Sequence, residues 1–268
     1  MEIKISIITI NLNNKIGLEK TIQSVVNQNY SNIEYIVIDG DSNDGSKDLL
    51  RNHKIHKAIS EKDSGIYNAM NKGLAFASGD YCLFLNSGDL IINSNIIEQI
   101  ATFISVNNYS EDIIYGDLVF ANKIRNYPSR IDLSYLLSDS LPHPASFFKR
   151  EIFDSNKLGL YRENYKIVSD WIFYFDAYIK QYKFRHIDKV ITVFDDAGIS
   201  SSNPNLENIE RNHALRNIYP NFTKDFMDLS TLIVYNSSKF HRYAEKLKLF
   251  FLKLKITKDL FKFQKKKE

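Results

Sequence analysis

Cysteine, proline and glycine are scarce in this sequence. The 268 residues include one cysteine, five prolines and ten glycines. A single cysteine excludes a disulfide framework within the chain, which fits a reducing compartment. Cys82 lies in the apolar run 81–85, where we expect a buried, inert thiol. The low proline and glycine content, with 44% hydrophobic residues, excludes disordered and low-complexity classes and predicts a packed core.

Signals for export and membrane insertion are also missing. No stretch of about 18 uncharged apolar residues is present, so the sequence predicts no membrane-spanning helix. The short apolar stretch at the N-terminus is not followed by a signal-peptide cleavage pattern. We therefore expect a cytoplasmic protein.

Several common catalytic motifs are missing as well. The sequence contains no P-loop, no G-x-G-x-x-G after the first predicted strand, no H-E-x-x-H and no G-x-S-x-G. These absences disfavour ATPases, dinucleotide dehydrogenases, zinc proteases and α/β-hydrolases.

Charge is distributed unevenly along the chain, although the net charge is only +3. Residues 239–268 hold 11 Lys and Arg against 3 Asp and Glu, which leaves 24 against 29 for residues 1–238. We interpret residues 226–268 as a basic amphipathic helical tail that attaches peripherally to the anionic inner face of the cytoplasmic membrane. Packing on the body or in a dimer remains an alternative. The lysine and phenylalanine stripes fit lipid better than nucleic acid.

Predicted strands and helices alternate over the first 90 residues. Apolar, often β-branched runs predict buried strands, and apolar residues at helical spacing predict helices. The predicted strands are 3–10, 33–38, 55–60 and 81–85, and the predicted helices are 17–28, 46–52 and 65–77. This alternation predicts an α/β fold with a mostly parallel central sheet flanked by helices.

The pattern after residue 90 is mixed. We predict helices at 95–106 and 169–181, two short strands within 113–127 and a strand at 190–194. No internal repeat and no linker rich in Pro, Gly or Ser interrupts the body of the chain. Residues 1–225 are therefore predicted to form one domain.

Polar clusters follow the predicted parallel strands at 9–14, 39–45 and 86–89. Ligands of open α/β sheets bind at these strand ends. In the cluster that begins at Asp39, a carboxylate can accept hydrogen bonds from a nucleobase imide or a ribose hydroxyl. A tight turn in which Asp caps the next helix explains the same residues equally well.

The cluster 86–89 contains one carboxylate, Asp89, next to the amide of Asn86. Mg²⁺ and Mn²⁺ prefer oxygen ligands and are often shared with a diphosphate, so Asp89 is a candidate metal ligand and Asn86 a candidate neutral one. A single carboxylate is little for a metal site, and an ordinary turn is the alternative.

Other candidates lie along the chain, each with a plain structural alternative. Asp63 begins the segment 63–73, where a helix N-terminus can bind an anion and Lys72 can neutralise a phosphate; a capped helix with a solvated lysine is the alternative. Asp170 opens an aromatic helix, as a cap or as a general base. His143, between two prolines, can bind metal or substrate, although a lone histidine is more often structural.

These motifs together resemble the family 2 glycosyltransferases of the GT-A fold. Seven segments occur in the same order, namely 7–11, 39–45, 61–73, 85–89, 143–144, 168–171 and 198–200. The resemblance covers roughly residues 3–202 and is nearest to the bacterial branch that builds O-antigen, capsule and exopolysaccharide. It implies a nucleotide-binding half at 1–90 and an acceptor-binding half at 91–225.

The resemblance also implies a reaction and site residues. A sugar moves with inversion from a nucleotide-diphosphate sugar, commonly UDP-linked, to a glycan or lipid-linked glycan acceptor, with Mn²⁺ or Mg²⁺ as cofactor. Asp170 is the implied catalytic base and Asp89 the implied metal ligand, with His143 as a further candidate ligand. The implied donor-binding residues are Thr9, Asn11, Asp39, Asp63, Asn71, Lys72, Ser87 and Gly88.

One departure from the family pattern affects the metal site. Many relatives have an acidic D-x-D-type segment, and its earlier positions here are Asn86 and Gly88, so only Asp89 keeps a carboxylate. This departure motivates a second hypothesis, a sugar-nucleotide-binding protein without transfer activity. A nucleotidyltransferase, which also combines an α/β sheet with a metal, is a third.

Overall fold

The computed structural model describes residues 2–52, 54–108, 110–195, 204–221 and 224–225. The chain divides into two compact units, 1–197 and 198–268, and each is described by itself. The predicted tail at 226–268 and the motif at 198–200 lie outside the described residues. The domain boundary at residue 225 stays a prediction.

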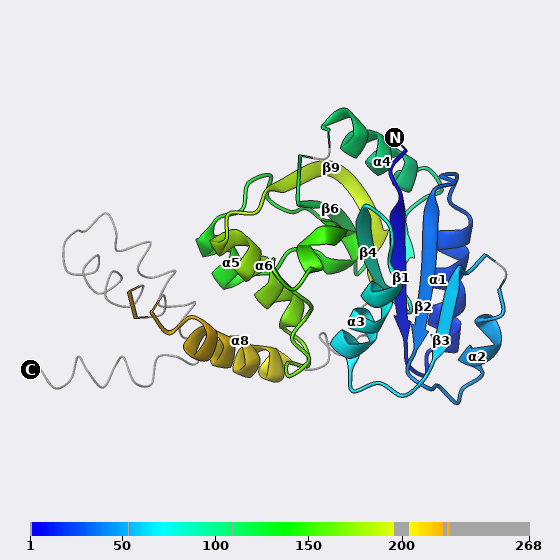
Figure 1. Cartoon of the computed structure of the whole chain (residues 1–268), viewed down its shortest axis with the longest axis horizontal. Helices are drawn as coiled ribbons and strands as arrows, with labels where there is room; N and C mark the ends of the chain where they lie inside the picture. Colours follow the sequence, from blue (N-terminus) through cyan, green and yellow to red (C-terminus); the bar gives the residue numbers. More distant parts are fainter. Residues whose placement is uncertain (1, 53, 109, 196–203, 222–223, 226–268) are drawn as a thin grey trace, which may run out of the picture. The chain divides into compact units, whose positions relative to one another are not determined.

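The first unit is built on a nine-stranded mixed sheet in the order β3-β2-β1-β4-β8-β6-β9-β5, with β7 paired to β6. Figure 1 shows β3, β2, β1 and β4 side by side. The strands are β1 (Ile5–Asn11), β2 (Ile33–Asp39), β3 (Lys57–Ser60), β4 (Tyr81–Asn86), β5 (Leu90–Ile91), β6 (Ile113–Phe120), β7 (Lys123–Arg125), β8 (Ser146–Lys149) and β9 (Phe184–Val193). The predicted α/β fold with parallel pairing of the first four strands is confirmed.

Helices and two short 3₁₀ turns connect the strands. The helices of the first unit are α1 (Lys15–Val26), α2 (Ser46–Leu49), α3 (Ile66–Phe76), α4 (Ile96–Val106), α5 (Leu133–Ser138) and α6 (Ser169–Ile179). The 3₁₀ turns are η1 (His143–Ala145) and η2 (Arg150–Phe153). In the second unit, α8 (Pro204–Ile218) carries an ion pair between Arg211 and Glu207 on successive turns, 2.8 Å apart.

Close packing of α3 on β1 depends on a glycine. All seven residues of β1 are buried, as expected of a strand covered on both faces. A Cβ atom built at Gly73 of α3 would lie 2.4 Å from Cγ2 of Ile8 on β1. The missing side chain at position 73 therefore sets the distance between helix and sheet.

Three short elements that follow β4 in the chain were not predicted from the sequence. The strands β5 and β8 have two and four residues, and α5 has six, so none is long enough to show a period. The strand β9 also begins at Phe184, six residues before the predicted strand, because polar residues interrupt its apolar pattern. The insertion of β8 antiparallel between β4 and β6 joins the parallel half of the sheet to the rest.

An aromatic cluster fills the space around β8. Phe84 of β4 packs edge-on against Phe148 of β8, with ring centres 5.9 Å apart, and against Tyr161, 5.5 Å away. Phe153 stacks on Phe173 of α6 at 4.7 Å. This cluster anchors α6, which carries Asp170, to the sheet.

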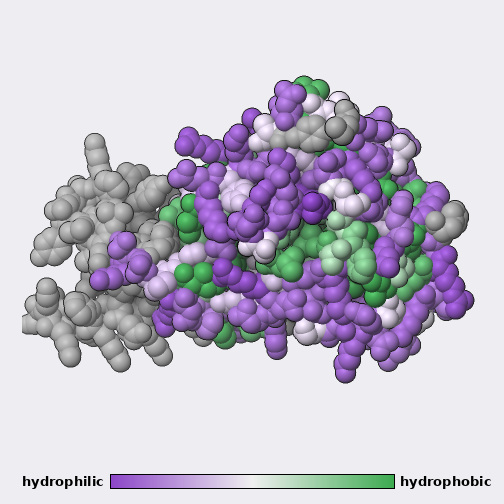
Figure 2. Space-filling view, viewed as in Figure 1, coloured by the Kyte–Doolittle hydropathy of each residue, from purple (hydrophilic) through white to green (hydrophobic). Residues whose placement is uncertain are grey.

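Polar residues cover most of the face seen in Figure 2, and apolar residues are exposed in its middle. Cys82 is fully buried, and burial holds the pKa of its thiol well above the ordinary value, as predicted for an inert cysteine. Within the described residues, no helix is long and apolar enough to span a bilayer.

Candidate active site

The register of the parallel strands brings the ends of β1, β2 and β4, and the polar clusters that follow them, to one edge of the sheet. Asn11 at the end of β1 pairs with Asp39 at the end of β2, and Ile10 pairs with Asn86 at the end of β4. The backbone N–H of Ser87 donates to the carbonyl of Ile10, at 2.9 Å, which continues the pairing into the turn. Three of the predicted polar clusters therefore share the C-terminal edge of the sheet.

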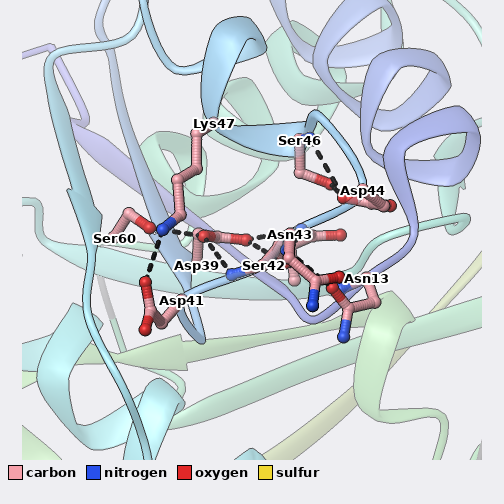
Figure 3. A network of polar contacts seen from close by, with 10 residues as sticks. Asn13, Asp39, Asp41, Ser42, Asn43, Asp44, Ser46, Lys47 and Ser60 are labelled. Carbon is pink, nitrogen blue, oxygen red and sulfur yellow. Dashed lines mark hydrogen bonds and ion pairs between the residues drawn. The ribbon is translucent and has the colours of Figure 1, made fainter.

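Asp39 organises the first cluster and is completely buried. Its Oδ1 accepts hydrogen bonds from Asn11 Nδ2 at 2.7 Å and from the Ser42 hydroxyl at 2.5 Å. Its Oδ2 accepts from the Ser42 backbone N–H at 3.0 Å and from the Ser60 hydroxyl at 2.6 Å (Figure 3). These bonds occupy the four acceptor positions of the carboxylate.

Hydrogen bonding determines the ionisation of Asp39. Burial by itself raises the pKa of the carboxyl group, but the bonds from Ser42, Ser60 and Asn11 outweigh burial and lower the pKa below its ordinary value. The group is therefore an ionised turn organiser. A donor molecule can reach it only by displacing one of these partners.

Thr9 and Asn11, the two predicted donor-binding residues of β1, differ in whether their polar atoms have hydrogen-bond partners. Thr9 is fully buried, and its hydroxyl lies 3.1 Å from that of Tyr35. Asn11 is 4% exposed, and its Oδ1 has no hydrogen-bond partner in the described part of the chain. A buried acceptor without a partner is costly, so Asn11 is the better candidate for a contact with a ligand N–H or O–H group.

The loop after Asp39 is fixed by its own side chains. Asp44 accepts from the backbone N–H of Lys15 at 2.7 Å and from the hydroxyl of Ser46 at 2.6 Å. Lys47 forms an ion pair with Asp41, which raises the pKa of the lysine (Figure 3). Both members are exposed, so the pair contributes little to stability.

Asp63 lies beside Gly40, one residue beyond β2. A Cβ atom built at Gly40 would lie 2.5 Å from Oδ2 of Asp63 and 3.2 Å from Cδ1 of Leu12. Oδ1 of Asp63 accepts from the backbone N–H of Gly65 at 3.1 Å. Position 40 therefore brings the second and third motifs together, and a side chain there would require Asp63 to shift.

Lys72 and Asn71 of α3 have protein partners in this structure. Lys72 Nζ lies 2.8 Å from Glu61 and donates to the carbonyl of Lys62 at 3.0 Å. Asn71 is buried, and its amide bonds to both backbone groups of Tyr161 and to the Glu163 carboxylate, at 2.9–3.0 Å. Asn71 thus links α3 to the segment before α6, and its predicted diphosphate contact stays a prediction.

The turn at 86–89 is held by Asp89 and Thr21. Asp89 is 1% exposed, and its carboxylate accepts from the backbone N–H groups of Asn86 at 2.9 Å and Asp195 at 3.0 Å. The Thr21 hydroxyl of α1 lies 2.9 Å from both the carbonyl of Asp89 and the N–H of Gly88. Burial raises the pKa of Asp89 to about 7 despite the two backbone bonds, and the charge of Asp195 adds to the increase.

The donor set at this turn suits a hard cation. Oxygen atoms come from Asp89, from Asp195 and from Asn86, whose buried Oδ1 has no partner among the described residues. Within that same part of the chain, no three His, Cys, Asp or Glu side chains come together as a metal-binding group. Mg²⁺ and Mn²⁺ are commonly held by one or two carboxylates together with substrate phosphates, so these residues fit such an ion.

His143 lies in the aromatic cluster. It is buried, its ring stacks on Phe84 at 5.2 Å, and its Nε2 is 2.9 Å from the Tyr161 hydroxyl. Burial lowers the pKa of the ring, while the charge of Asp170 acts in the opposite direction. These surroundings favour a packed structural histidine, the alternative reading of the sequence, and present no second metal ligand.

Asp170 is half-buried in the first turn of α6. The N-cap residue of this helix is Val168, and Oδ1 of Asp170 accepts a hydrogen bond from the hydroxyl of Tyr67 at 2.8 Å. The hydroxyl has one proton, which it shares between Oδ1 and the carbonyl oxygen of Ile167, 2.5 Å away. Tyr67, on α3, therefore orients the carboxylate from the donor-binding half of the chain.

Residues 6–154 match the protein family described as glycosyl transferase family 2. The chain belongs to glycosyl transferase family 2. A glycosyltransferase of Mycobacterium tuberculosis is 35% identical over 205 residues, which cover 74% of this chain and 77% of that protein. The family 2 assignment confirms the resemblance read from the motif order, although no O-antigen or capsule branch is specified.

Solved structures support the GT-A fold for this family 2 chain. The structure of Staphylococcus aureus TarS residues 1–349 in complex with UDP-GlcNAc has a TM-score of 0.63 at 19% identity, over 80% of this chain and 67% of that one. The chain spans 40% of a longer TarS chain. The mannosyltransferase PcManGT from Pyrobaculum calidifontis, in complex with GDP-Man and Mn²⁺, has a TM-score of 0.56 at 11% identity. The match covers 96% of this chain and 87% of that one.

Sequence reasoning missed four residues that shape the site. Ser42 and Ser60 hold Asp39, Tyr67 holds Asp170, and Asp195 holds Asp89. Ser42 lies inside the motif 39–45, three residues after Asp39, where a hydrogen bond to the aspartate is common in turns. The other three act across long separations in sequence, where a single sequence carries no signal.

Proposed function

We propose that this family 2 protein transfers a sugar from a nucleotide-diphosphate sugar, with UDP as the carrier, to a hydroxyl group of a glycan acceptor. The observation that carries the proposal is the shared strand-end edge, where Asn11, Asp39 and the turn at 86–89 lie together in a chain of this family. The nucleotide sugars in the titles of the two structural relatives support the donor class, although one is a UDP sugar and the other a GDP sugar.

Asp170 is the proposed catalytic base. Its carboxylate takes the proton from the acceptor hydroxyl while that oxygen bonds to the anomeric carbon. The bond from the anomeric carbon to the diphosphate oxygen breaks, its electron pair leaves with the nucleotide diphosphate, and the configuration inverts. Tyr67 keeps Oδ1 of Asp170 in place by its hydrogen bond of 2.8 Å.

Asp89 and Asn86 are the proposed residues that hold a divalent cation, Mn²⁺ or Mg²⁺, in the donor site. When bound, such an ion stabilises negative charge on the leaving diphosphate. Asn11 is the proposed partner of the nucleoside, because its Oδ1 is buried and unsatisfied. We do not propose His143 as a ligand, since its ring is enclosed by aromatic side chains.

The finer parts of the proposal concern the acceptor and its location. We propose a lipid-linked glycan acceptor in surface polysaccharide synthesis and peripheral attachment to the inner face of the cytoplasmic membrane through residues 226–268. The basic, apolar composition of that segment supports the attachment. A variant ending at residue 225 should then no longer float with anionic vesicles, and undiminished flotation would contradict the attachment.

The decisive experiment compares Asp170→Asn with Asp176→Asn, which makes the same charge change on the same helix. With a panel of nucleotide sugars and Mn²⁺, we expect Asp170→Asn to lose on the order of 10²- to 10⁴-fold in turnover while donor binding is retained. Asp176→Asn should keep its turnover. Full turnover in Asp170→Asn would remove it as the base, and donor binding by the wild type without transfer or hydrolysis would support the non-catalytic alternative.

A further inference from the structure

Three side chains of α3 bind the segment that leads into α6. Tyr67 reaches the proposed base, and the amide of Asn71 bonds to both backbone groups of Tyr161. The third side chain is Asn68, whose Nδ2 donates to Oε2 of Glu163 at 2.9 Å. Position 71 is four residues after 67 and three after 68, so the three side chains share one side of the helix.

The carboxylate of Glu163 joins two of these side chains. Its Oε1 accepts from Nδ2 of Asn71 and its Oε2 accepts from Nδ2 of Asn68, each at 2.9 Å. The two amides lie on successive turns of α3, so a single carboxylate bridges them and ties the chain at position 163 to the helix. Bonds to a charged acceptor are stronger than bonds between neutral groups, and this bridge contains two of them.

The same segment is closed onto the start of α6. The backbone N–H of Arg162 donates to the hydroxyl of Ser169, the first residue of that helix, at 2.6 Å. Glu163 follows Arg162 in the chain, and Asp170 follows Ser169. A shift of the chain at position 163 is therefore transmitted to the base through one neighbouring residue and one short hydrogen bond.

The direct hold of α3 on the base is limited. The hydroxyl of Tyr67 has one proton, which it shares between Asp170 and the carbonyl of Ile167. A general base must lie within hydrogen-bond reach of the proton that it removes, and a small misplacement lowers the rate strongly. The bridge at position 163 fixes the spacing between α3 and the start of α6 on which this shared bond depends.

We propose that Glu163 is a positioning residue for the transfer reaction. Its bridge to α3 holds the start of α6 where Tyr67 can bond to Asp170. The inference rests on the proposed function for the role of Asp170 as the base. Because Glu163 acts through the base and not on the donor, its loss should lower turnover and leave donor affinity unchanged.

The kinetic test uses the full chain with Mn²⁺ and a nucleotide sugar that the wild type turns over. Glu163→Ala removes both bonds of the bridge, and we expect kcat to fall roughly fivefold with an unchanged Kd for UDP. In a Tyr67→Phe background the same substitution should change kcat by less than about twofold, because both residues act through one bond. The control Glu98→Ala removes an exposed carboxylate of α4 and should match the wild type.

A conservative variant checks the bridge itself. Glu163→Gln should keep most of kcat, since the amide of Asn68 can rotate by 180° and accept from the new NH₂ group. A kcat within twofold of the wild type in Glu163→Ala overturns the proposal. So does an equal loss with and without Tyr67→Phe, which would show that the two residues act independently.

A measurement without turnover separates failure of this proposal from failure of the proposed function. Trp171 is the one tryptophan of the chain, is buried and directly follows the base, so acrylamide quenching of its fluorescence reports how firmly the start of α6 is held. We expect the quenching constant to rise about twofold in Glu163→Ala and to stay unchanged in Glu98→Ala. Equal quenching in Glu163→Ala and the wild type overturns the proposal. Increased quenching in a protein that turns over no nucleotide sugar supports the bridge and counts against the proposed function alone.

Discussion

Replacing Asp39 by asparagine tests whether this residue organises the turn or contacts the donor. The four hydrogen bonds of its carboxylate come from Asn11, Ser60 and two groups of Ser42. An asparagine amide accepts on one side only. If the NH₂ group of the asparagine takes the place of Oδ2, it faces the backbone N–H of Ser42. Two donors then point at each other, because a backbone N–H cannot act as an acceptor. If the NH₂ group takes the place of Oδ1, it faces Nδ2 of Asn11. The side-chain amide of Asn11 must then rotate by 180° to present its oxygen.

The flip of Asn11 is the cheaper solution, because its unsatisfied Oδ1 then accepts from the new amide. The charge-assisted character of the four bonds is lost in either orientation. Hydrogen bonds to charged groups contribute about 1.5–3 kcal/mol each, and partial rescue leaves a net loss of about 2 kcal/mol in the free energy of unfolding. Because the pKa of Asp39 is lowered, this stability is present above the unfolded pKa and is lost as pH falls through the folded value.

Urea denaturation at pH 7 measures the effect, with Asp41→Asn as the control. Asp41 is exposed, so its variant should change the free energy of unfolding by less than about 0.5 kcal/mol. A variant Asp39→Asn as stable as the wild type but unable to bind UDP would refute the reasoning. Asp39 would then be a donor ligand that the protein does not need for folding.

Three further substitutions probe the same framework. Tyr67→Phe should lower kcat about tenfold with an unchanged Kd for the donor, because Asp170 loses its orienting bond; equal kcat values would contradict this. Gly73→Ala should cost about 1–3 kcal/mol in urea denaturation, since its Cβ would collide with Ile8, and an unchanged midpoint would contradict the packing. Glu34 accepts from Lys4, Ser6 and Ser78; burial opposes ionisation, but these bonds lower its pKa to about 2. Glu34→Gln should therefore be less stable by about 1–2 kcal/mol above about pH 5, with the difference shrinking as pH falls towards 2.

The parallel half of the fold was predictable because its strands are continuous apolar runs. The run that forms β1 is buried at every position, and Asp39 marks the end of β2 as the sequence indicates. The C-terminal half was less predictable, since β8 is four residues long and is recognisable as a strand only from its place between β4 and β6. A strand of four residues is too short to show a sequence period, whatever its residue types.

The site was predictable as a set of motifs but not as a set of contacts. Asp39 and Asn11 were candidates because each lies at the end of a buried strand. Nothing in the sequence shows that all hydrogen-bond acceptor positions of Asp39 are filled, or that Oδ1 of Asn11 has no partner among the described residues. The donor contact of Asn71 stays a prediction, and the bonds of its amide to Tyr161 and Glu163 are contacts that the sequence does not indicate. Such choices are made by tertiary packing, which a single sequence does not encode locally.

The place of β8 in the sheet has a consequence for synthesis of the chain. The strands β1 to β4 are complete once residue 86 has been made, but the neighbour of β4 on its other side begins at residue 146. At translation rates of about 5–20 residues per second, that edge stays unpaired for roughly 3–12 seconds. Five of the six residues of β4 are buried in the finished sheet, so the nascent chain presents an apolar, hydrogen-bonding edge throughout this interval. Slower elongation before residue 146 therefore lengthens the time during which this edge can pair with another chain.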